Sequence, residues 1–207
     1  MKLKPIVLLF SFLLSLVLPG ASLEESMDQP TAFQQSYAFE NQGQYSKGIS
    51  VLLKVYSADS YEINLRLAWL SYLNGAYTES MSYYQKAGVL MPYSLEARLG
   101  YVLPAAAVGN WEQVVAKYRE VLQIDPKHKI ANNRRASIYY NREEYAASFK
   151  LLKTVVNLYP FEYDSLVLFA WTHLKMGKTR EAKVLFQKVL LVSPQDQSAL
   201  EGLALLQ

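Results

Sequence analysis

The sequence predicts an all-α protein, an α-solenoid in which pairs of helices stack along the chain. The first observation is a proline that recurs every 34 residues, at Pro92, Pro126, Pro160 and Pro194. The second is that small and bulky apolar residues recur at the same step. The third is the composition, 51% hydrophobic and 19% charged, which is typical of a folded globular chain. Because one helix pair cannot bury its own apolar face, we expect consecutive pairs to stack.

The first thirty residues have the pattern of an export signal rather than of a repeat. A basic start, Met1–Lys4, precedes an uncharged apolar run from Ile6 to Leu18, and small or turn-forming residues follow. Secretory signal peptides have this layout, and the run is shorter than the ~20 residues of a spanning helix. We therefore predict a signal peptide at 1–21 and a polar linker at 22–30. The alternative is a retained N-terminal anchor, and only then do we expect membrane attachment.

Five columns of residues repeat at the 34-residue step. Glycine precedes an aromatic residue by two positions, as in Gly75 with Tyr77 and Gly109 with Trp111. A column of small residues contains Ala68, Val102, Ala136 and Ala170. A column of bulky residues contains Tyr84, Tyr118, Leu152 and Phe186. A column of aliphatic residues contains Ala87, Val121, Val155 and Val189.

Each column has a physical role in a helix-turn-helix unit. A small residue lets two helices cross closely, and bulky apolar residues fill the space between them. Glycine ends the first helix, where the backbone becomes left-handed, and proline ends the second because it has no amide hydrogen. These roles predict two helices per unit and about eleven helices after the signal segment.

This pattern of small residue, Gly-x-aromatic, bulky residues and proline resembles the tetratricopeptide repeat (TPR) family. The resemblance covers nearly all of the chain after the signal segment and implies a right-handed superhelix with a concave inner surface. The solenoid is predicted over 31–207, with units at 31–60, 61–94, 95–128, 129–162 and 163–196 and a closing helix at 197–207. The first unit fits less well, because it is short and lacks the terminal proline.

Two residues depart from the repeat. Pro104 lies inside the predicted first helix of its unit, Leu95 to Val108, where proline removes a hydrogen bond and usually kinks a helix. We expect a bent or broken helix there. Glu143 replaces the turn glycine, and we expect that turn to be slightly strained or differently shaped.

The resemblance implies binding in the inner groove, which the first helix of each unit lines. The 3–4 spacing of a helix places four positions of each such helix on one face, and this face is apolar and aromatic with an acidic edge. We predict that the groove is lined by Leu65, Trp69, Tyr72, Leu99, Leu103, Asn133, Ser137, Tyr140, Val167 and Trp171.

The predicted lining favours an apolar or aromatic peptide segment as the ligand. Some family members hold a C-terminal carboxylate with Lys, Arg and Asn, but here Asn133 and Arg134 are the only partial match. Two alternatives remain open. Trp69 and Trp171 either face the groove or pack against the neighbouring unit, and exposed aromatic residues are also consistent with a dimer interface.

A basic cluster surrounds the start of the fourth unit, and it contains Lys127, His128, Lys129, Arg134, Arg135 and Arg142. It is either a site for an acidic or phosphorylated partner or a solvated segment that Glu143 and Glu144 compensate. Isolated exposed charges contribute little, and we favour the solvated interpretation.

No residue pattern indicates catalysis, a cofactor or a metal. The chain has no cysteine, its two histidines, His128 and His173, are far apart in sequence, and no phosphate-binding or nucleophile motif is present. We interpret His173 as a partly buried packing residue. Lys2 and Lys4 supply most of the net charge of +3, so nucleic acid is not an expected partner.

We therefore predict an exported, periplasmic or secreted, non-enzymatic scaffold of the cell envelope that binds a protein or peptide. One alternative is a structural homo-oligomer, because the closing helix is rich in leucine at an end that repeat proteins normally keep polar. Another is an accessory subunit of a cell-envelope synthesis or secretion complex.

Overall fold

The computed structural model describes residues 27–207, and the predicted signal peptide at 1–21 lies outside this range. Within 27–207 the chain forms eleven α-helices and no strand, as the 34-residue repeat predicts. No helix in this range has the length and apolar character needed to cross a membrane. The helices are α1 (Gln29–Asn41), α2 (Tyr45–Leu53), α3 (Tyr61–Leu73), α4 (Tyr77–Leu90), α5 (Leu95–Ala107), α6 (Trp111–Ile124), α7 (Lys129–Asn141), α8 (Tyr145–Leu158), α9 (Tyr163–Lys175), α10 (Thr179–Val192) and α11 (Gln197–Ala204).

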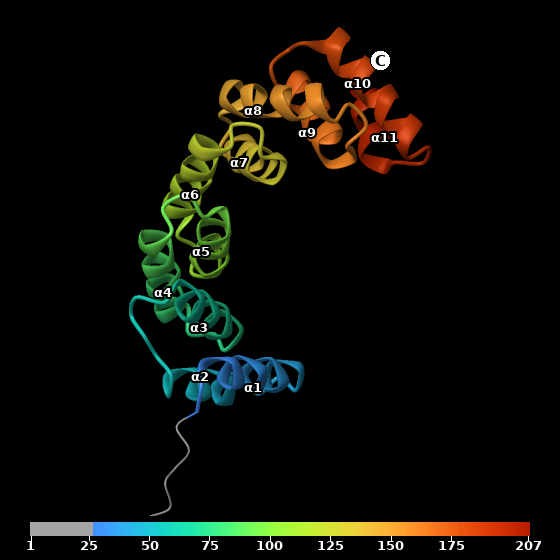
Figure 1. Cartoon of the computed structure of the whole chain (residues 1–207). Coiled ribbons are helices and arrows are strands. Elements are labelled where there is room, and N and C mark those ends of the chain that lie inside the picture. Colours follow the sequence, from blue (N-terminus) through green and yellow to red (C-terminus); the bar gives the residue numbers. More distant parts are fainter. Residues whose placement is uncertain (1–26) are drawn as a thin grey trace, which may run out of the picture.

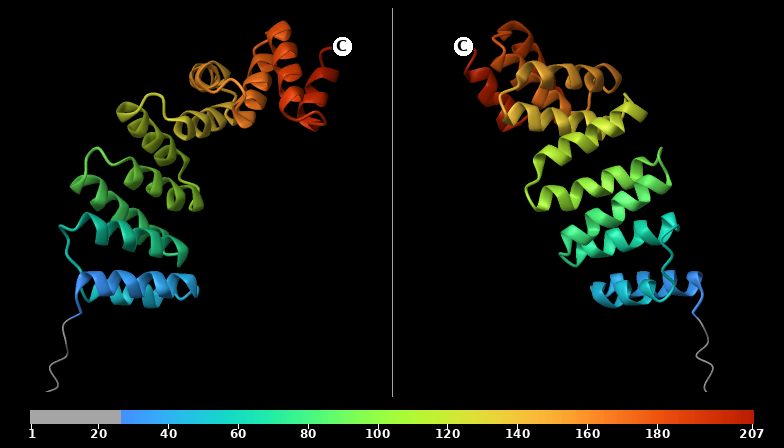
Figure 2. Two further views of the ribbon diagram at one scale, coloured as in Figure 1. Left: turned by 45° about the vertical axis from the view of Figure 1, so that its right-hand side comes forward. Right: turned by 90° about the vertical axis from the view of Figure 1, so that its left-hand side faces the viewer.

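The helices stack as successive hairpins into a curved α-solenoid (Figure 1). The odd-numbered helices α3, α5 and α7 lie on the inner side of the arc, and α4, α6 and α8 lie on the outer side. Figure 2 shows the hairpins from two further sides, with α11 at the end opposite to α1. The inner surface of the arc is therefore built from the first helix of each unit, as the resemblance implied.

The first unit is complete in its helices although its sequence fits the repeat less well. Helix α1 begins at Gln29, so the last residues of the predicted linker belong to the solenoid. The Asp28 carboxylate accepts a hydrogen bond from the Thr31 amide at 2.9 Å, and Pro30 lies in the first turn. Proline is tolerated there because the first amides of a helix have no partner within it. Pro30 therefore starts a helix rather than ending the linker.

The turns between the paired helices require a left-handed backbone. Gly75, Gly109 and Gly177 have φ angles of 78°, 74° and 73°, and Glu143 has a φ of 62° in the same column. The turn at Glu143 thus keeps the left-handed backbone of the others, so of the two expected outcomes, a strained or a differently shaped turn, the structure has the first. Its strain is as predicted, because a residue with a Cβ is disfavoured in this conformation.

A column that the sequence analysis did not identify caps the odd-numbered helices. At this position, Ser60, Ser94, His128, Glu162 and Asp196 each accept a hydrogen bond from the backbone amide three residues later. Side-chain caps satisfy amides that a helix start leaves without partners. The five capping residues are of four types, so the position repeats but the residue does not. A search for identical residues at the 34-residue step therefore does not detect this column.

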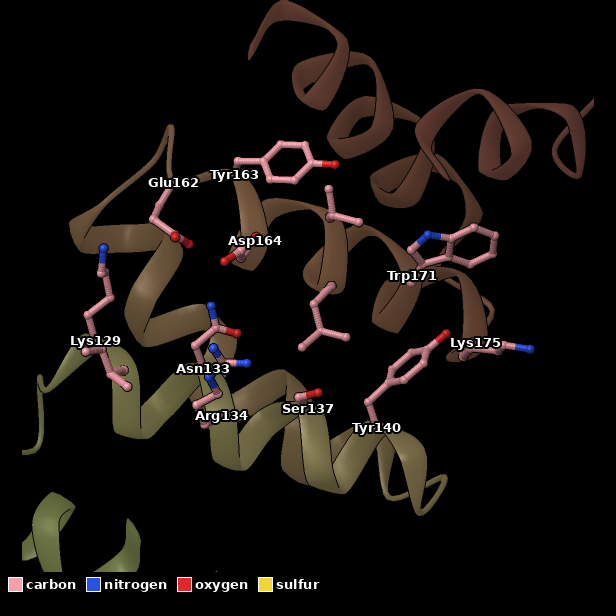
Figure 3. A pocket seen from close by; sticks show the side chains of 13 residues that line it. Lys129, Asn133, Arg134, Ser137, Tyr140, Glu162, Tyr163, Asp164, Trp171 and Lys175 are labelled. Atoms are coloured by element: carbon pink, nitrogen blue, oxygen red, sulfur yellow. The ribbon is translucent and has the colours of Figure 1, made fainter. Parts of the chain in front are cut away.

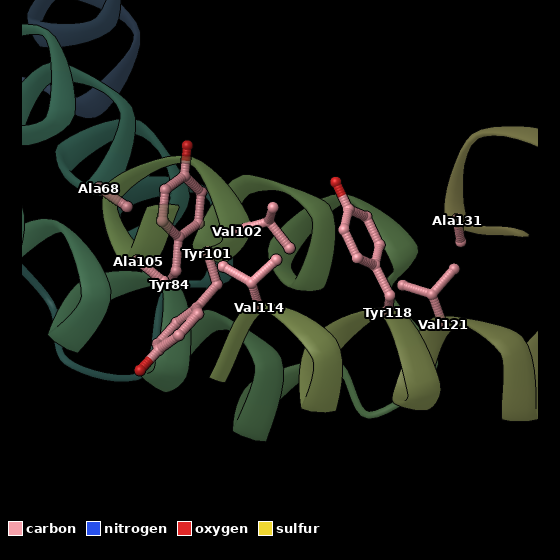
Figure 4. Close-up of a cluster of buried hydrophobic side chains, with 9 residues drawn as sticks. All are labelled: Ala68, Tyr84, Tyr101, Val102, Ala105, Val114, Tyr118, Val121 and Ala131. Carbon is pink, nitrogen blue, oxygen red and sulfur yellow. The ribbon is translucent and has the colours of Figure 1, made fainter. Parts of the chain in front are cut away.

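The central core is formed by side chains from α3 to α7, and three of them are tyrosines (Figure 4). The ring of Tyr84 lies on Gly100, where an added Cβ would be 2.2 Å from the ring. Phe186 and Gly202 form the equivalent contact further along, also at 2.2 Å. In both places a bulky residue of one unit packs directly on the backbone of the next unit, so glycine is needed there for space.

Pro104 does not break α5, which runs without interruption from Leu95 to Ala107. The ring of Pro104 is buried, and its carbonyl still accepts the Val108 amide at 3.2 Å. The carbonyl that proline crowds belongs to Gly100, which has no side chain. Packing of α5 against α4 and α6 therefore keeps the helix intact, and the predicted break is wrong.

Candidate binding grooves on the concave face

Nine of the ten predicted groove residues line two separate hollows on the inner surface. The first, called the α3–α5 groove, has a volume of about 540 Å³, and the second, called the α7–α9 groove, has a volume of about 760 Å³. Both volumes lie in the range of ligand-binding pockets. The residues of the α3–α5 groove are Leu65, Trp69, Tyr84, Glu96, Leu99, Gly100 and Leu103. Those of the α7–α9 groove are Lys129, Ile130, Asn133, Arg134, Ser137, Tyr140, Glu162, Tyr163, Asp164, Val167, Leu168, Trp171 and Lys175.

The α3–α5 groove is almost entirely apolar, and Glu96 is the charged residue that lines it. Leu103 is 39% exposed, so part of this apolar lining faces water. Burial raises the pKa of Tyr84, so this tyrosine is neutral throughout the physiological range. The groove therefore offers hydrophobic contact and few hydrogen bonds to a ligand.

Trp69 is fixed in this groove by contacts with the preceding unit. Its indole Nε1 donates to the Glu40 carboxylate at 2.7 Å, and Glu40 also forms an ion pair with Arg66. The Arg66 guanidinium lies 3.7 Å from the centre of the Tyr37 ring. This network holds the indole in one orientation and leaves its ring surface for apolar contact.

Tyr72 is the predicted residue that lines neither groove. Its ring packs beside Trp69, with 5.8 Å between the ring centres, and beside Tyr77 at 6.0 Å. It therefore supports Trp69 from the side. The prediction that Tyr72 lines the groove is therefore wrong, because neighbouring rings occupy its contact surface.

The α7–α9 groove combines an aromatic end with a charged end (Figure 3). Tyr140 and Trp171 lie at one end together with Lys175, and Lys129 and Glu162 lie at the other. Trp171 donates its Nε1 hydrogen to Ser198 Oγ at 2.7 Å and packs edge-on against Phe186, with 5.2 Å between ring centres. Its orientation is thus fixed by the following unit.

The sequence left open whether each tryptophan faces the groove or packs against a neighbouring unit, and both tryptophans do both. Trp69 bonds to the preceding unit and Trp171 to the following one, and both also line a groove. A ring that is already oriented loses little entropy when a ligand contacts it. Packing within the array and lining the groove are compatible roles here.

The basic cluster divides into residues inside the groove and residues outside it. Lys129 and Arg134 line the α7–α9 groove. Arg142 forms an ion pair with Glu112 of α6 at 2.9 Å, and Arg135 donates to the Tyr139 hydroxyl at 2.7 Å. The acid in direct contact with Arg142 is therefore Glu112 of the preceding unit, rather than Glu143 or Glu144.

The two histidines contact neighbouring residues of the fold: His173 packs in the interior, and His128 caps a helix. His173 is 6% exposed, its Nδ1 lies 2.7 Å from the Phe169 carbonyl, and its ring packs edge-on against Phe149 and Phe169. Burial lowers the pKa of His173 below its usual value of 6.5. His128 caps α7 through Nδ1. Within residues 27–207 no cluster of side chains suited to a metal ion occurs.

Sequence reasoning missed the groove residues that precede or begin α9. Glu162 caps α9 by accepting the Ser165 amide at 2.8 Å, and the Tyr163 hydroxyl hydrogen-bonds to Asp196. Tyr61 makes the matching contact with Ser94, at 2.8 Å between the two oxygens. The signal that could have identified the start of α9 is the 34-residue step of the capping position from Ser94 through His128 to Glu162.

Comparisons with known proteins agree with the architecture. Family models described as tetratricopeptide repeat match residues 33–88 and 163–196. A tetratricopeptide repeat protein from Parabacteroides merdae ATCC 43184 is 17% identical, with a TM-score of 0.72 over 86% of this chain and 71% of that chain. No curated protein gives a significant match to the sequence.

Two MamA structures have similar folds. One is 15% identical, with a TM-score of 0.69 over 80% of this chain and 92% of that chain. MamA from Desulfovibrio magneticus RS-1 is 14% identical, with a TM-score of 0.67 over 81% of this chain and 96% of that chain. At such identities the likeness concerns the fold. The two model matches and the repeated columns identify the chain as a tetratricopeptide repeat protein.

Proposed function

We propose that the protein is a non-enzymatic scaffold that binds a segment of another protein along its concave face. The observation that carries this proposal is the pair of inner grooves, each containing a tryptophan whose ring is already held in place. Rigid aromatic residues in hollows commonly contribute most of the binding energy of an interface. The surrounding aliphatic residues, such as Leu99 and Val167, exclude water from the contact.

The test compares proteins captured by the wild type and by groove variants. Trp69→Ala combined with Trp171→Ala removes both rings, and Trp111→Ala is the matched control because Trp111 is 50% exposed and lines neither groove. Purified protein is cross-linked to an extract of the source cells, and captured proteins are quantified by mass spectrometry. We expect partners that fall at least about tenfold with the double variant and stay with the control, as expected for hot-spot residues.

A second pair of variants guards against loss of folding. Leu103→Arg and Ser137→Arg place a long charged side chain in each groove without removing the indole hydrogen bonds. Circular dichroism is expected to show unchanged helicity, together with loss of the same partners. Capture of identical partners by every variant would exclude groove binding.

Export to the periplasm or the exterior is part of this proposal, supported by the basic and apolar pattern of residues 1–21. The intact mass of the protein purified from its natural source is the measurement. We expect a chain that begins after Ala21 or Ser22. A protein that retains Met1 would contradict cleavage and favour an anchored form.

Self-assembly is a second candidate, because α11 lacks a covering helix within the described range. Leu166 in α9 is fully buried, whereas Leu200, at the equivalent position of α11, is 43% exposed. Leu205 is 64% exposed nearby. Sedimentation velocity from 1 to 200 μM (roughly the range of weak protein association) tests this candidate. A monomer throughout removes it, and an oligomer that Leu200→Glu dissociates supports it.

A further inference from the structure

The charged end of the α7–α9 groove has walls of opposite sign. Lys129 and Arg134 belong to α7, whereas Glu162 and Asp164 belong to the start of α9 (Figure 3). The sequence of α7 contains no acidic residue. At this end of the hollow one wall is therefore basic and the facing wall is acidic, whereas Lys175 of α9 lies at the aromatic end.

The charges on these walls do not neutralise each other by direct contact. Within residues 27–207 the ion pairs join Arg66 to Glu40, Arg98 and Lys117 to Glu120, and Arg142 to Glu112. None of them involves Lys129, Arg134, Glu162 or Asp164. Each wall thus keeps its charge available to a ligand that enters the groove.

Helix stability explains the acidic wall better than the basic wall. Glu162 caps α9 and Asp164 lies in its first turn, where negative charge is favourable. Lys129 is the first residue of α7, where positive charge is unfavourable. Its ammonium group lies 5.7 Å from the centre of the Tyr159 ring, a contact compatible with an exposed position. The helix therefore gains nothing from the charge of Lys129.

We infer that the α7–α9 groove selects a peptide segment that carries one acidic and one basic side chain next to an apolar or aromatic one. The acidic side chain pairs with Lys129 and Arg134, the basic one with Asp164, and the apolar one contacts Tyr140 and Trp171. A segment with charges of one sign is attracted by one wall and repelled by the other. The inference rests on the proposed function and names the chemistry of the ligand.

The α3–α5 groove supplies the internal contrast. Its lining includes the single carboxylate of Glu96, which the Tyr61 hydroxyl approaches at 3.2 Å, and no basic residue. A mixed pair of charges finds no matching pair of walls there. Selection for mixed charge is therefore expected from the α7–α9 groove alone.

Four fluorescein-labelled peptides of equal length test the inference. All contain the same Leu-Phe half, and the other half carries Glu-Lys, Lys-Glu, Glu-Glu or Lys-Lys. Fluorescence anisotropy with the mature protein at low salt is expected to show that the better mixed peptide binds about fivefold more tightly than either single-sign peptide. This is the effect of one or two partly exposed ion pairs. In 1 M salt, where the screening length is about 3 Å, the preference is expected to vanish.

Charge-removing variants show which wall is responsible. Lys129→Gln with Arg134→Gln leaves the acidic wall, so the Lys-Lys peptide is expected to become the tightest ligand. Asp164→Asn weakens the acidic wall, so Glu-Glu is expected to improve by about threefold, the size of one partly exposed ion pair. Lys127→Gln with Lys153→Gln is the matched control, because both residues are exposed and line neither groove. The control is expected to keep the mixed preference.

The outcomes separate this inference from the proposed function. Equal binding of all four peptides, or tightest binding of a single-sign peptide to the wild type, overturns charge selection while leaving groove binding intact. Loss of every peptide with Trp171→Ala would still support the groove as the binding site. If no peptide binds the wild type and captured partners ignore the groove variants, both proposals fail.

Discussion

The unit at 61–94 and the unit at 129–162 have the same two-helix architecture but obtain it with different residues. In the first, Ser60 caps the first helix and Gly75 forms the turn. In the second, His128 caps and Glu143 forms the turn with the same positive φ. The later unit therefore forms the same cap and turn from residues that have a weaker local preference for those positions.

The two units also differ in how they contact the next unit. The Tyr84 ring of the earlier unit lies on Gly100 of the next unit. In the later unit the residue equivalent to Tyr84 is Leu152, which is fully buried, and the residue equivalent to Gly100 is Leu168. The groove beside the first unit is apolar, and the groove beside the second is charged. The comparison teaches that the array fixes the positions of packing and capping residues, while the residues that face the groove are free to differ.

The largest expected effect comes from disrupting the contact of the unit at 61–94 with the unit that follows it. Gly100→Ala places a Cβ where the Tyr84 ring now lies, at 2.2 Å. We expect the free energy of unfolding to fall by about 1–3 kcal/mol, the usual range for overpacking. Urea denaturation followed by circular dichroism measures this change.

Gly88→Ala is the matched control for that substitution. Gly88 is helical, and an added Cβ would meet nothing within 4 Å. Since alanine favours a helix, this variant is expected to be stabilised by up to about 1 kcal/mol. Equal effects of the two substitutions would show that the ring contact is not what requires Gly100.

Restoring glycine in the turn of the later unit sharpens the comparison. Glu143→Gly relieves the left-handed strain at a φ of 62°, and we expect a gain of about 0.5–1 kcal/mol. Gly177→Ala, which introduces the strain in the next unit, is expected to cost a similar amount. Hydrogen exchange of α7 and α8 amides localises the effect. A loss of stability on Glu143→Gly would show that the glutamate side chain has a favourable contact.

The residues that cap the odd-numbered helices offer a test of similar size. Ser94→Ala removes the oxygen that accepts the Ala97 amide at 3.1 Å, and a cost of about 1 kcal/mol is expected. His128→Ser places the residue of the earlier units at the start of α7, and a gain of a few tenths of a kcal/mol is expected. Thermal unfolding of both variants measures the difference. A His128→Ser variant that loses stability would show that the imidazole does more than cap the helix.

The smallest expected effect is a dependence of stability on pH. Burial lowers the pKa of His173, so the unfolded chain binds a proton more readily than the folded chain. The contribution of this residue is complete above about pH 6.5 and decreases as pH falls below that value. Urea denaturation between pH 7.5 and 5 is expected to show that the free energy of unfolding falls less steeply with falling pH in His173→Gln than in the wild type. Parallel slopes for wild type and His173→Gln would contradict this assignment.

By itself the sequence determined the repeat and the helix pairs that follow from it. The 34-residue step of proline, glycine and small residues predicted about eleven helices, and eleven are present in residues 27–207. The 3–4 spacing also placed nine of the ten predicted residues in the linings of the grooves. These features were predictable because each depends on backbone geometry or on the face of a single helix.

Only the tertiary structure decided how neighbouring units use those faces. It kept α5 intact through Pro104, joined Arg142 to Glu112 and joined Trp69 to Glu40. It also brought Glu162 and Lys129 to the same hollow although they are 33 positions apart in sequence. Each of these depends on contacts between units, whose distances and angles no periodic pattern specifies, because side-chain packing at the crossing of two helices sets them.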